Sequence, residues 1–236
     1  MTSVDKDIAA DNARWTFSNI SDSFEEHVRK SVPLYEEGHD LVGRYSDFFV
    51  KDRSLVCEIG CSTGALSRKL LARHQDRGQL RFLGIDPVED MVQKARERGG
   101  SDSRAEYMCD DAMNVDMAGA DLIVSYYTLQ FVPPATRQYL VDKIYQSLNW
   151  GGAFLLFEKV RAPDARFQDY AAQIYADFKL DGGFSTDEIV NKTRSLKGVL
   201  EPFSTQGNVD LLKRAGFVDV SSIMKWVCFE GFLAIK

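Results

Sequence analysis

Acidic residues end or follow three successive apolar runs of the sequence, and their order suits a charged nucleoside ligand. Glu58 stands two residues before Gly60, Asp86 ends the next run, and Asp111 follows the third. A carboxylate beside a glycine-rich loop can accept a hydrogen bond from an ammonium group, directly or through water. An acid at the end of the following strand can accept hydrogen bonds from both hydroxyls of a ribose. Each acid alone also fits a turn or a helix cap, but the three in order indicate a ligand with an ammonium group and a ribose.

The glycine-rich loop after Glu58 does not match a dinucleotide-binding loop. It reads Gly60-Cys-Ser62-Thr-Gly64 and lies between an apolar run and a helix-like segment. A loop that cradles a pyrophosphate has the pattern GxGxxG, and its second and third glycine positions are here Ser62 and Ala65. The acid two residues before the first glycine would also repel a pyrophosphate. The loop therefore favours an amino-acid moiety over phosphates.

These residues need a sheet to bring them together, and the sequence alternates strand-like with helix-like segments. Short apolar runs predict strands, and amphipathic segments between them predict helices. The predicted strands are 55–59, 80–85, 105–108, 121–125 and 153–158. The predicted helices between them are 65–72, 88–98 and 134–148. This order is typical of βαβ units, so we expect an α/β fold with a doubly wound, seven-stranded, mostly parallel sheet.

Further segments complete the expected fold. Residues 161–200 are helical in composition, with breaks at Pro163 and at Gly182-Gly183, and predict a helical insertion. Residues 149–152 predict a turn, 208–214 a short helix, and 217–224 with 226–235 an antiparallel pair of strands. Residues 1–50, which include Trp15 and Phe17, predict helices packed over the mouth of the sheet. No linker-like segment interrupts the sequence, so we expect a single domain, 1–236.

The composition is typical of a soluble globular protein with a mildly acidic balance. The 236 residues include 29 Lys plus Arg and 35 Asp plus Glu, and the net charge of −6 disfavours a broad nucleic-acid-binding surface. The first residues lack the pattern of a signal peptide, and no apolar run approaches the ~20 residues that span a bilayer. The four cysteines form no CxxC pair, and no cluster has metal-ligand spacing. We expect a cytoplasmic protein with reduced thiols and no metal site.

From about Trp15 to its end, the chain resembles the class I S-adenosylmethionine-dependent methyltransferases, and more closely the carboxy-S-adenosyl-L-methionine synthase family. The specific motifs are Gly60-Cys-Ser62 and Tyr127-Thr-Leu-Gln-Phe131, accompanied by Phe157-Glu-Lys159. The resemblance implies a homodimer with a doubly wound fold that binds S-adenosylmethionine. By position, it implies that the following residues line the cofactor site: Tyr35, Gly60, Cys61, Ser62, Asp86, Pro87, Asp111 and Ala112. Glu58 is expected to join them, because its carboxylate can accept a hydrogen bond from the ammonium group of the cofactor.

Two positions depart from that family. The family has an asparagine just before Phe-Thr-Leu-Gln-Phe, whereas this chain has Tyr126, which we expect to line the cofactor site. The family also uses an arginine of the inserted region, across the dimer interface, to grip the extra carboxylate of its cofactor. Counting without a gap places Thr193 at that position. Arg194 lies one residue later, about 100° further around a helix, where it would point elsewhere.

We therefore predict an S-adenosylmethionine-dependent methyltransferase that acts on a small-molecule acceptor, with Tyr126, Tyr127 and Arg194 as candidate catalytic residues. Methyl transfer mainly requires that the acceptor be aligned, desolvated and, if needed, deprotonated. The tyrosines also fit core packing, and Arg194 fits a solvated helix face.

Three other functions remain open. The first is a carboxy-S-adenosyl-L-methionine synthase that uses prephenate as carboxyl donor, because a one-residue shift in the helix would return Arg194 to the clamp. Its cofactor would then occur as carboxy-S-adenosyl-L-methionine. The second is a regulatory protein that binds the cofactor without turnover. An RNA methyltransferase ranks last, because the balance of charge is acidic and no basic stripe with interleaved aromatics is present.

Overall fold

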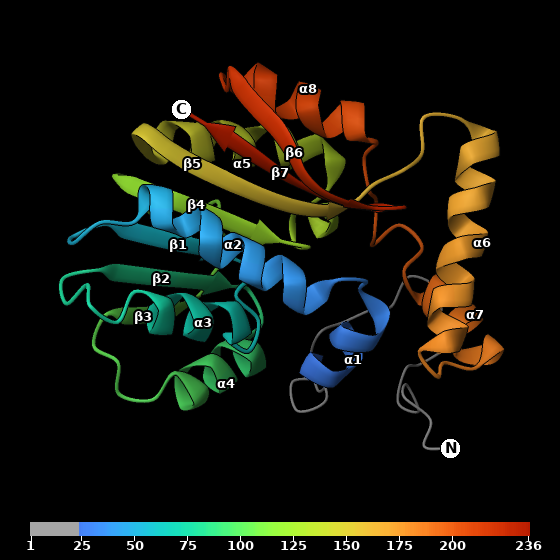
Figure 1. Ribbon diagram of the computed structural model, residues 1–236, viewed down its shortest axis with the longest axis horizontal. Helices are drawn as coiled ribbons and strands as arrows, with labels where there is room; N and C mark the ends of the chain where they lie inside the picture. The colour runs from blue at the N-terminus through green and yellow to red at the C-terminus, as the bar shows by residue number, and fades with distance from the viewer. Residues whose placement is uncertain (1–23) are drawn as a thin grey trace.

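The structure, a computed structural model, describes residues 24–236 and is built on a seven-stranded sheet (Figure 1). The strand order is β3-β2-β1-β4-β5-β7-β6, in which β7 is antiparallel to both neighbours and the other neighbouring pairs are parallel. The doubly wound α/β fold and the final antiparallel pair are therefore confirmed. The strands are β1 (Leu55–Ile59), β2 (Arg81–Asp86), β3 (Ala105–Cys109), β4 (Ala120–Tyr126), β5 (Leu148–Lys159), β6 (Asp219–Trp226) and β7 (Phe229–Ile235). Trp15 and Phe17 of the expected N-terminal helices lie outside the described residues.

Helices cover both faces of the sheet. Successive side chains of a strand point to opposite faces, and both faces carry apolar side chains that need to be buried. Cys57 and Ile59 of β1 pack in one cluster with side chains of α5 and α8. Val56 packs in the other cluster, with side chains of α2 and α3. Apart from the buried Glu58, both faces of β1 are therefore apolar, as expected for a buried parallel strand. The helices are α1 (Phe24–Ser31), α2 (Tyr35–Phe49), α3 (Ala65–Arg73), α4 (Glu89–Gly99), α5 (Pro134–Ser147), α6 (Ala165–Asp181), α7 (Thr186–Ser195) and α8 (Thr205–Ala215), with a short 3-10 helix, η1 (Leu129–Phe131).

Helices α1, α6 and α7 lie beyond the carboxyl ends of the parallel strands rather than on a face of the sheet (Figure 1). Their boundaries follow local sequence signals. The Asp164 side chain accepts a hydrogen bond from the Phe167 amide at the start of α6. Ser185 and Glu188 form a reciprocal capping box at the start of α7. These helices cover the edge of the sheet at which ligands bind in doubly wound folds.

The start of β5 differs from the prediction. Residues 149–152 were expected to form a turn, but β5 begins at Leu148 and includes them. The pairing with β4 shifts there, because Ala120 pairs with Leu148 whereas Leu122 pairs with Ala153. Gly151 has φ +79°, and its amide donates to the carbonyl of the last residue of the chain at 2.8 Å. The segment does bend as a turn would, but its backbone hydrogen bonds keep it within the strand.

A buried arginine joins the segment after β4 to the chain that leads into α8. Arg137 of α5 is 1% exposed, and its guanidinium donates to the carbonyl oxygens of Val132 (2.7 Å), Glu201 (3.1 Å) and Gln130 (3.3 Å). The guanidinium carbon also lies 4.2 Å from the centroid of the Phe203 ring. Arg137 thus fixes two segments that are far apart in the sequence, and both border the cavity described below.

Replacing this arginine should destabilise the whole protein. We expect Arg137→Met to lower the free energy of unfolding by about 2–4 kcal/mol, because it leaves buried carbonyl oxygens without donors. Arg137→Lys keeps the charge but cannot reach the same set of carbonyls, so it should recover only part of the loss. Urea denaturation followed by circular dichroism measures both. A loss below 1 kcal/mol for Arg137→Met would contradict this role.

Candidate functional site

A cavity of about 570 Å³ lies off the carboxyl ends of β1, β2, β4 and β5. Its walls are the glycine-rich loop after β1, the segments after β2, β4 and β5, and residues of α1, α2, α6 and α7. A cavity of this size suits a small-molecule ligand, and its position is the usual ligand-binding edge of a doubly wound sheet.

The glycine-rich loop turns sharply at the end of β1 because of a close approach between two segments. Gly60 has φ +75°, and a Cβ atom at this position would lie 2.0 Å from Oγ1 of Thr128. Only glycine therefore allows the loop to pass the segment that follows β4. Two residues later, the Ser62 amide donates to Oδ2 of Asp86 at 3.0 Å, and the Val88 amide donates to Oδ1 at 3.0 Å. These bonds fix the Asp86 carboxylate at the cavity wall.

Glu58 lies next to this loop and is almost completely buried. It is 3% exposed, and Oγ of Ser67 donates to its Oε2 at 2.5 Å. Burial raises the pKa of Glu58 to about 8, although the hydrogen bond from Ser67 opposes this shift. The negative charge of Asp86 raises it further. A cationic group in the cavity would stabilise the ionised carboxylate, so Glu58 is poised to lose its proton when such a ligand binds.

Aromatic residues form the wall between α2 and β4. Oη of Tyr126 donates to the carbonyl oxygen of Tyr35 at 2.7 Å, and the two rings lie 5.4 Å apart. The His39 ring lies 4.6 Å from that of Tyr126, and burial lowers the pKa of His39 to about 4. Burial also raises the pKa of Tyr126 well above its usual value. Tyr126 therefore remains protonated at neutral pH, and its hydroxyl is held by the Tyr35 carbonyl at the cavity wall.

Tyr127 has an unusual backbone conformation that places its side chain at the cavity. Its φ is +59°, a left-handed value that is strained for a tyrosine. The ring lies 5.7 Å from that of Phe229, and the residue is 8% exposed. Its buried hydroxyl has no hydrogen-bond partner among residues 24–236. The strain and the unbonded hydroxyl together mark Tyr127 as a candidate ligand-binding residue.

A side-chain amide joins the backbone of this tyrosine to the end of β5. Nε2 of Gln130 donates to the carbonyl oxygen of Tyr127 at 3.1 Å, and its Oε1 accepts from the amide of Lys159 at 2.9 Å. Gln130 and Lys159 stand in two of the motifs that carry the family resemblance, but the motifs alone predict no role for either residue. The position of Lys159 after an apolar run, next to the strand that leads to Tyr127, is the sequence signal that could have indicated its role.

Lys159 carries its charge against aromatic rings. Nζ lies 4.2 Å from the ring centroid of Tyr175 and 5.9 Å from that of Phe229. The Nζ atom itself makes no hydrogen bond or ion pair within the described part of the chain. Burial lowers the pKa of Lys159. Lys159 is not alone at this end of the cavity, whose walls also contain these cations: Arg161, Lys179, Lys192 and Lys197.

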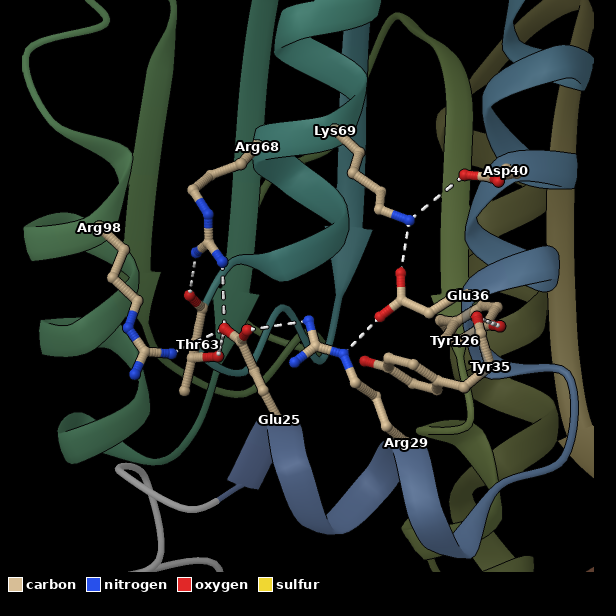
Figure 2. A network of polar contacts seen from close by, with 10 residues as sticks. All are labelled: Glu25, Arg29, Tyr35, Glu36, Asp40, Thr63, Arg68, Lys69, Arg98 and Tyr126. Carbon is tan, nitrogen blue, oxygen red and sulfur yellow. Dashed lines mark hydrogen bonds and ion pairs between the residues drawn. The ribbon is translucent and has the colours of Figure 1, made fainter.

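A network of charged side chains fastens α1 to the glycine-rich loop and to α3 and α4 (Figure 2). Glu25 accepts hydrogen bonds from Thr63 Oγ1 (2.8 Å), Arg68 (3.0 Å) and Arg98 (2.7 Å). Arg29 of the same helix bonds to Glu36, which in turn bonds to Lys69 at 2.6 Å, and Lys69 also contacts Asp40. The Glu25 side chain is only 16% exposed, so water screens its ion pairs less than ordinary surface pairs. The network holds α1 over the loop that borders the cavity.

Nine of the predicted site residues line the cavity together. They are Tyr35, Glu58, Gly60, Cys61, Ser62, Asp86, Pro87, Tyr126 and Tyr127.

The other three predicted residues lie elsewhere. Asp111 is exposed, and its carboxylate accepts from the Met113 amide at 2.8 Å. Ala112 is buried in the core beneath it. Arg194 is exposed near the end of α7, whereas Thr193 lines the cavity. The functional roles of all twelve residues stay predictions.

The four cysteines are free thiols. Cys57, Cys61 and Cys228 are buried, whereas Cys109 is exposed at the end of β3, where its Sγ lies 3.7 Å from the Pro87 carbonyl oxygen. Between residues 24 and 236, no group of three or more His, Cys, Asp or Glu is arranged to hold a metal ion. No helix in the same range is both long and apolar enough to cross a membrane.

Comparisons with known proteins agree with this geometry. Residues 56–152 match the family described as a methyltransferase domain. The chain is 36% identical over 228 residues to a carboxy-S-adenosyl-L-methionine synthase of Staphylococcus epidermidis, covering 94% of this chain and 97% of that protein. It is 34% identical over 220 residues to the enzyme of the same name from Campylobacter lari, covering 93% of each.

Solved structures show the same fold. Human N-acetylserotonin methyltransferase in complex with S-adenosylmethionine matches with a TM-score of 0.56 and 15% identity, covering 96% of this chain and 63% of that one. The S-adenosylmethionine-dependent methyltransferase SibL matches with a TM-score of 0.64 and 18% identity, covering 93% and 59%. At such low identity, these matches concern the fold alone.

The raised pKa of Glu58 predicts a pH-dependent affinity for S-adenosylmethionine. Below pH 8 the free protein holds a proton on Glu58, and binding of an ammonium group must release it, so affinity gained through Glu58 should grow as the pH rises from 6 to 8. Glu58→Gln mimics the protonated form. Isothermal titration calorimetry at several pH values should therefore show a Kd ratio of variant to wild type that increases with pH. A ratio independent of pH would exclude a charged contact at Glu58.

The network around Glu25 predicts that salt controls ligand release. We expect Glu25→Gln to accelerate dissociation of S-adenosylmethionine several-fold, because α1 loses the carboxylate shared by Arg68 and Arg98. Added salt should accelerate dissociation from the wild type more than from the variant. Glu106→Gln serves as the control, because Glu106 is an exposed residue of β3. Stopped-flow chase experiments measure the rates. Equal rates for wild type and Glu25→Gln would show that the Glu25 network does not retain the ligand by holding α1 over the cavity.

Proposed function

This chain belongs to the carboxy-S-adenosyl-L-methionine synthase family and is an S-adenosylmethionine-dependent transferase, and we propose that it carboxylates the methyl carbon of S-adenosylmethionine, with prephenate as the donor. The observation that carries this proposal is the separation of charge along the cavity. Glu58 of β1 and Asp86 of β2 border one end of it, and five cations, which outnumber the acids there, border the other end, off β5 and the helices that follow it. The second substrate is therefore expected to be an anion.

The strand order explains how the charges are separated. Asp86 ends β2 and Glu58 lies in β1, whereas Lys159 ends β5, and β4 runs between the two groups. A cofactor with its ribose on Asp86 and its ammonium group near Glu58 would direct its sulfonium methyl towards β4 and β5. Asp111 and Ala112, beyond β3, would then border the adenine. The methyl carbon would face the cationic end.

The cationic end suits a dicarboxylate such as prephenate. Five cations line it, from β5, the segment after it, α6 and the α7 region. Two carboxylates, those of Glu188 and Glu201, also border this end, but Glu188 accepts from the Ser185 amide as part of the α7 cap. The cations thus exceed the acids, and they support binding of a ligand with two negative charges.

The proposed reaction balances without an added oxidant or reductant. The methyl carbon loses a proton and gains a bond to the carboxyl carbon of the donor. The prephenate ring loses that carboxyl group and its hydroxyl and becomes aromatic, which leaves phenylpyruvate. The proton and the hydroxyl leave as water. In this proposal the chain supplies alignment, exclusion of water by α1, and cations that hold the donor.

We further propose that the protein is a cytoplasmic homodimer of single-domain chains. Arg194 is exposed on α7 outside its own cavity, a position from which it could reach the cavity of a partner and grip the new carboxylate. The neighbouring helix α6 exposes apolar side chains that would suit an interface. These side chains are Phe167, Tyr170, Ile174 and Leu180. Four free thiols support the cytoplasmic location.

A second candidate function is methyl transfer to a small-molecule acceptor. It is favoured by Tyr126 in the place of the family's asparagine and by the absence of Arg194 from the cavity wall of its own chain. Nucleic acid remains the least favoured substrate in our proposal, because of the net charge of −6.

Mass spectrometry separates the two functions. The protein is incubated with S-adenosylmethionine, with and without prephenate, and the cofactor is analysed. We expect prephenate to produce a cofactor heavier by one CO2 unit, together with phenylpyruvate. S-adenosylhomocysteine formed with an acceptor, and no carboxylated product, would instead support methyl transfer.

Complementation tests the shared site. Arg194→Met and Glu58→Gln should each lose most carboxylation, since one lacks the proposed clamp and the other the proposed ammonium contact. If Arg194 acts across the interface, mixed dimers contain one intact site. Mixing the two variants should then restore about a quarter of the wild-type rate after random exchange. Failure of the mixture to recover activity, with exchange verified by native mass spectrometry, would contradict action across the interface.

A further inference from the structure

We infer that Nζ of Lys159 and the hydroxyl of Tyr127 together form a subsite for the carboxylate that is transferred, with Gln130 as the residue that positions both. This inference rests on the proposed function, because it assigns one of the donor's two carboxylates to particular side chains. It also assigns a role to the unbonded Tyr127 hydroxyl.

Lys159 has the properties of a cation that can bind an anionic ligand. It lies at the last position of β5, and its charge contacts the rings of Tyr175 and Phe229. No carboxylate of residues 24–236 forms an ion pair with it. Burial lowers the pKa of Lys159, so the charge is stabilised poorly while the cavity holds no anion. A carboxylate beside Nζ would remove this penalty, which favours binding of an anion at this point.

Tyr127 supplies a second donor on the same wall. Its ring lies near that of Phe229 from the residue after β4, and the Lys159 ammonium group lies near the same ring from the end of β5. Its hydroxyl is buried, without a partner in the described chain, and burial next to Glu158 raises the pKa of Tyr127, so the proton stays on the oxygen. One carboxylate can accept from both groups, one bond on each oxygen.

Gln130 fixes the main chain of the two residues that supply the donors. Its carboxamide donates to the carbonyl oxygen of Tyr127 and accepts from the amide of Lys159. The amide group alone combines a donor and an acceptor in this geometry, and a carboxylate could not donate to Tyr127. The bond to Tyr127 also stabilises its left-handed conformation, which directs the side chain.

The subsite lies next to the expected position of the sulfonium methyl. Thr128 directly follows Tyr127, and its hydroxyl approaches the backbone of Gly60 so closely that no Cβ would fit between them. The cofactor loop and the Tyr127 segment are therefore in contact. A carboxylate held by Lys159 and Tyr127 would lie beside the cofactor, whereas Arg161 and Lys197, which line the same cavity, would hold the second carboxylate.

The test separates donor binding from cofactor binding. Lys159→Met and Tyr127→Phe are compared with wild type and with Lys213→Met, an exposed lysine of α8 far from the cavity walls. We expect Lys159→Met to raise the KM for prephenate at least tenfold and Tyr127→Phe to raise it several-fold, with the Kd for S-adenosylmethionine within twofold of wild type. Lys159→Arg should recover part of the loss. An unchanged KM in Lys159→Met, or an equal loss of affinity for S-adenosylmethionine, would overturn the assignment.

Gln130→Glu tests positioning. It should raise the KM for prephenate while leaving the Kd for S-adenosylmethionine near wild type, and Gln130→Asn, whose shorter side chain keeps both functional groups, should give an intermediate KM. Melting temperatures identify any variant that fails to fold. If Lys159→Met does not fold, Lys159→Arg and Tyr127→Phe decide the matter, and wild-type KM values in both would contradict the subsite.

A binding experiment distinguishes failure of this inference from failure of the proposed function. The protein loaded with S-adenosylmethionine is titrated with succinate and, as a neutral control, with its dimethyl ester. Succinate should bind wild type and Lys213→Met, but at least tenfold more weakly to Lys159→Met. If wild type makes no carboxylated cofactor yet shows this pattern, the proposed function fails and the carboxylate subsite stands. If wild type does make it and Lys159→Met matches wild type in both assays, the subsite fails alone.

Discussion

The carboxamide of Gln130 is the contact on which the geometry of the cavity depends. Through its side chain it joins the end of β4 to the end of β5, and through its main-chain carbonyl it accepts from Arg137 and from the Glu201 amide. Four segments from separate parts of the chain therefore meet at one residue. Each buried polar group left unpaired there would cost about 1–3 kcal/mol, so the arrangement is cooperative. Gln130 therefore fixes the main chain of the strained Tyr127 and of the partly buried Lys159.

One end of the cavity carries Glu58 and Asp86 and the other an excess of cations, because the two ends are built from different structural units. The acidic end comes from the first two strands of the chain, whose ends are fixed by main-chain hydrogen bonds to Asp86. The cationic end comes from β5 and from helices that lie off the sheet (Figure 1). In the proposed function, substitutions in α6 and α7 would therefore change binding of the second substrate without disturbing the cofactor loop, which is how one fold supports several reactions.

The sequence predicted the fold well and the site in part. Apolar runs ending in Glu58-Ile-Gly60 or in Asp86-Pro87 gave nearly correct strand ends, because local packing and turn chemistry determine them. The residues at those ends line the cavity as expected. Lys159 was missed because a lysine after a strand usually faces water, and here the rings of Tyr175 in α6 and Phe229 in β7 enclose its ammonium group. The direction of Arg194 depends on how α7 packs, which a residue count does not determine.

The distribution of thiols has a practical consequence. Of the four free cysteines, Cys109 is the exposed one, and it stands at the end of β3 beside Pro87, at the margin of the cavity. Maleimide dyes react with accessible thiolates, so the natural sequence offers one exposed labelling point, although Glu89 raises the pKa of this thiol and labelling is favoured at alkaline pH. A fluorophore at Cys109 would sit near the expected adenine end and could report occupancy of the cavity in real time.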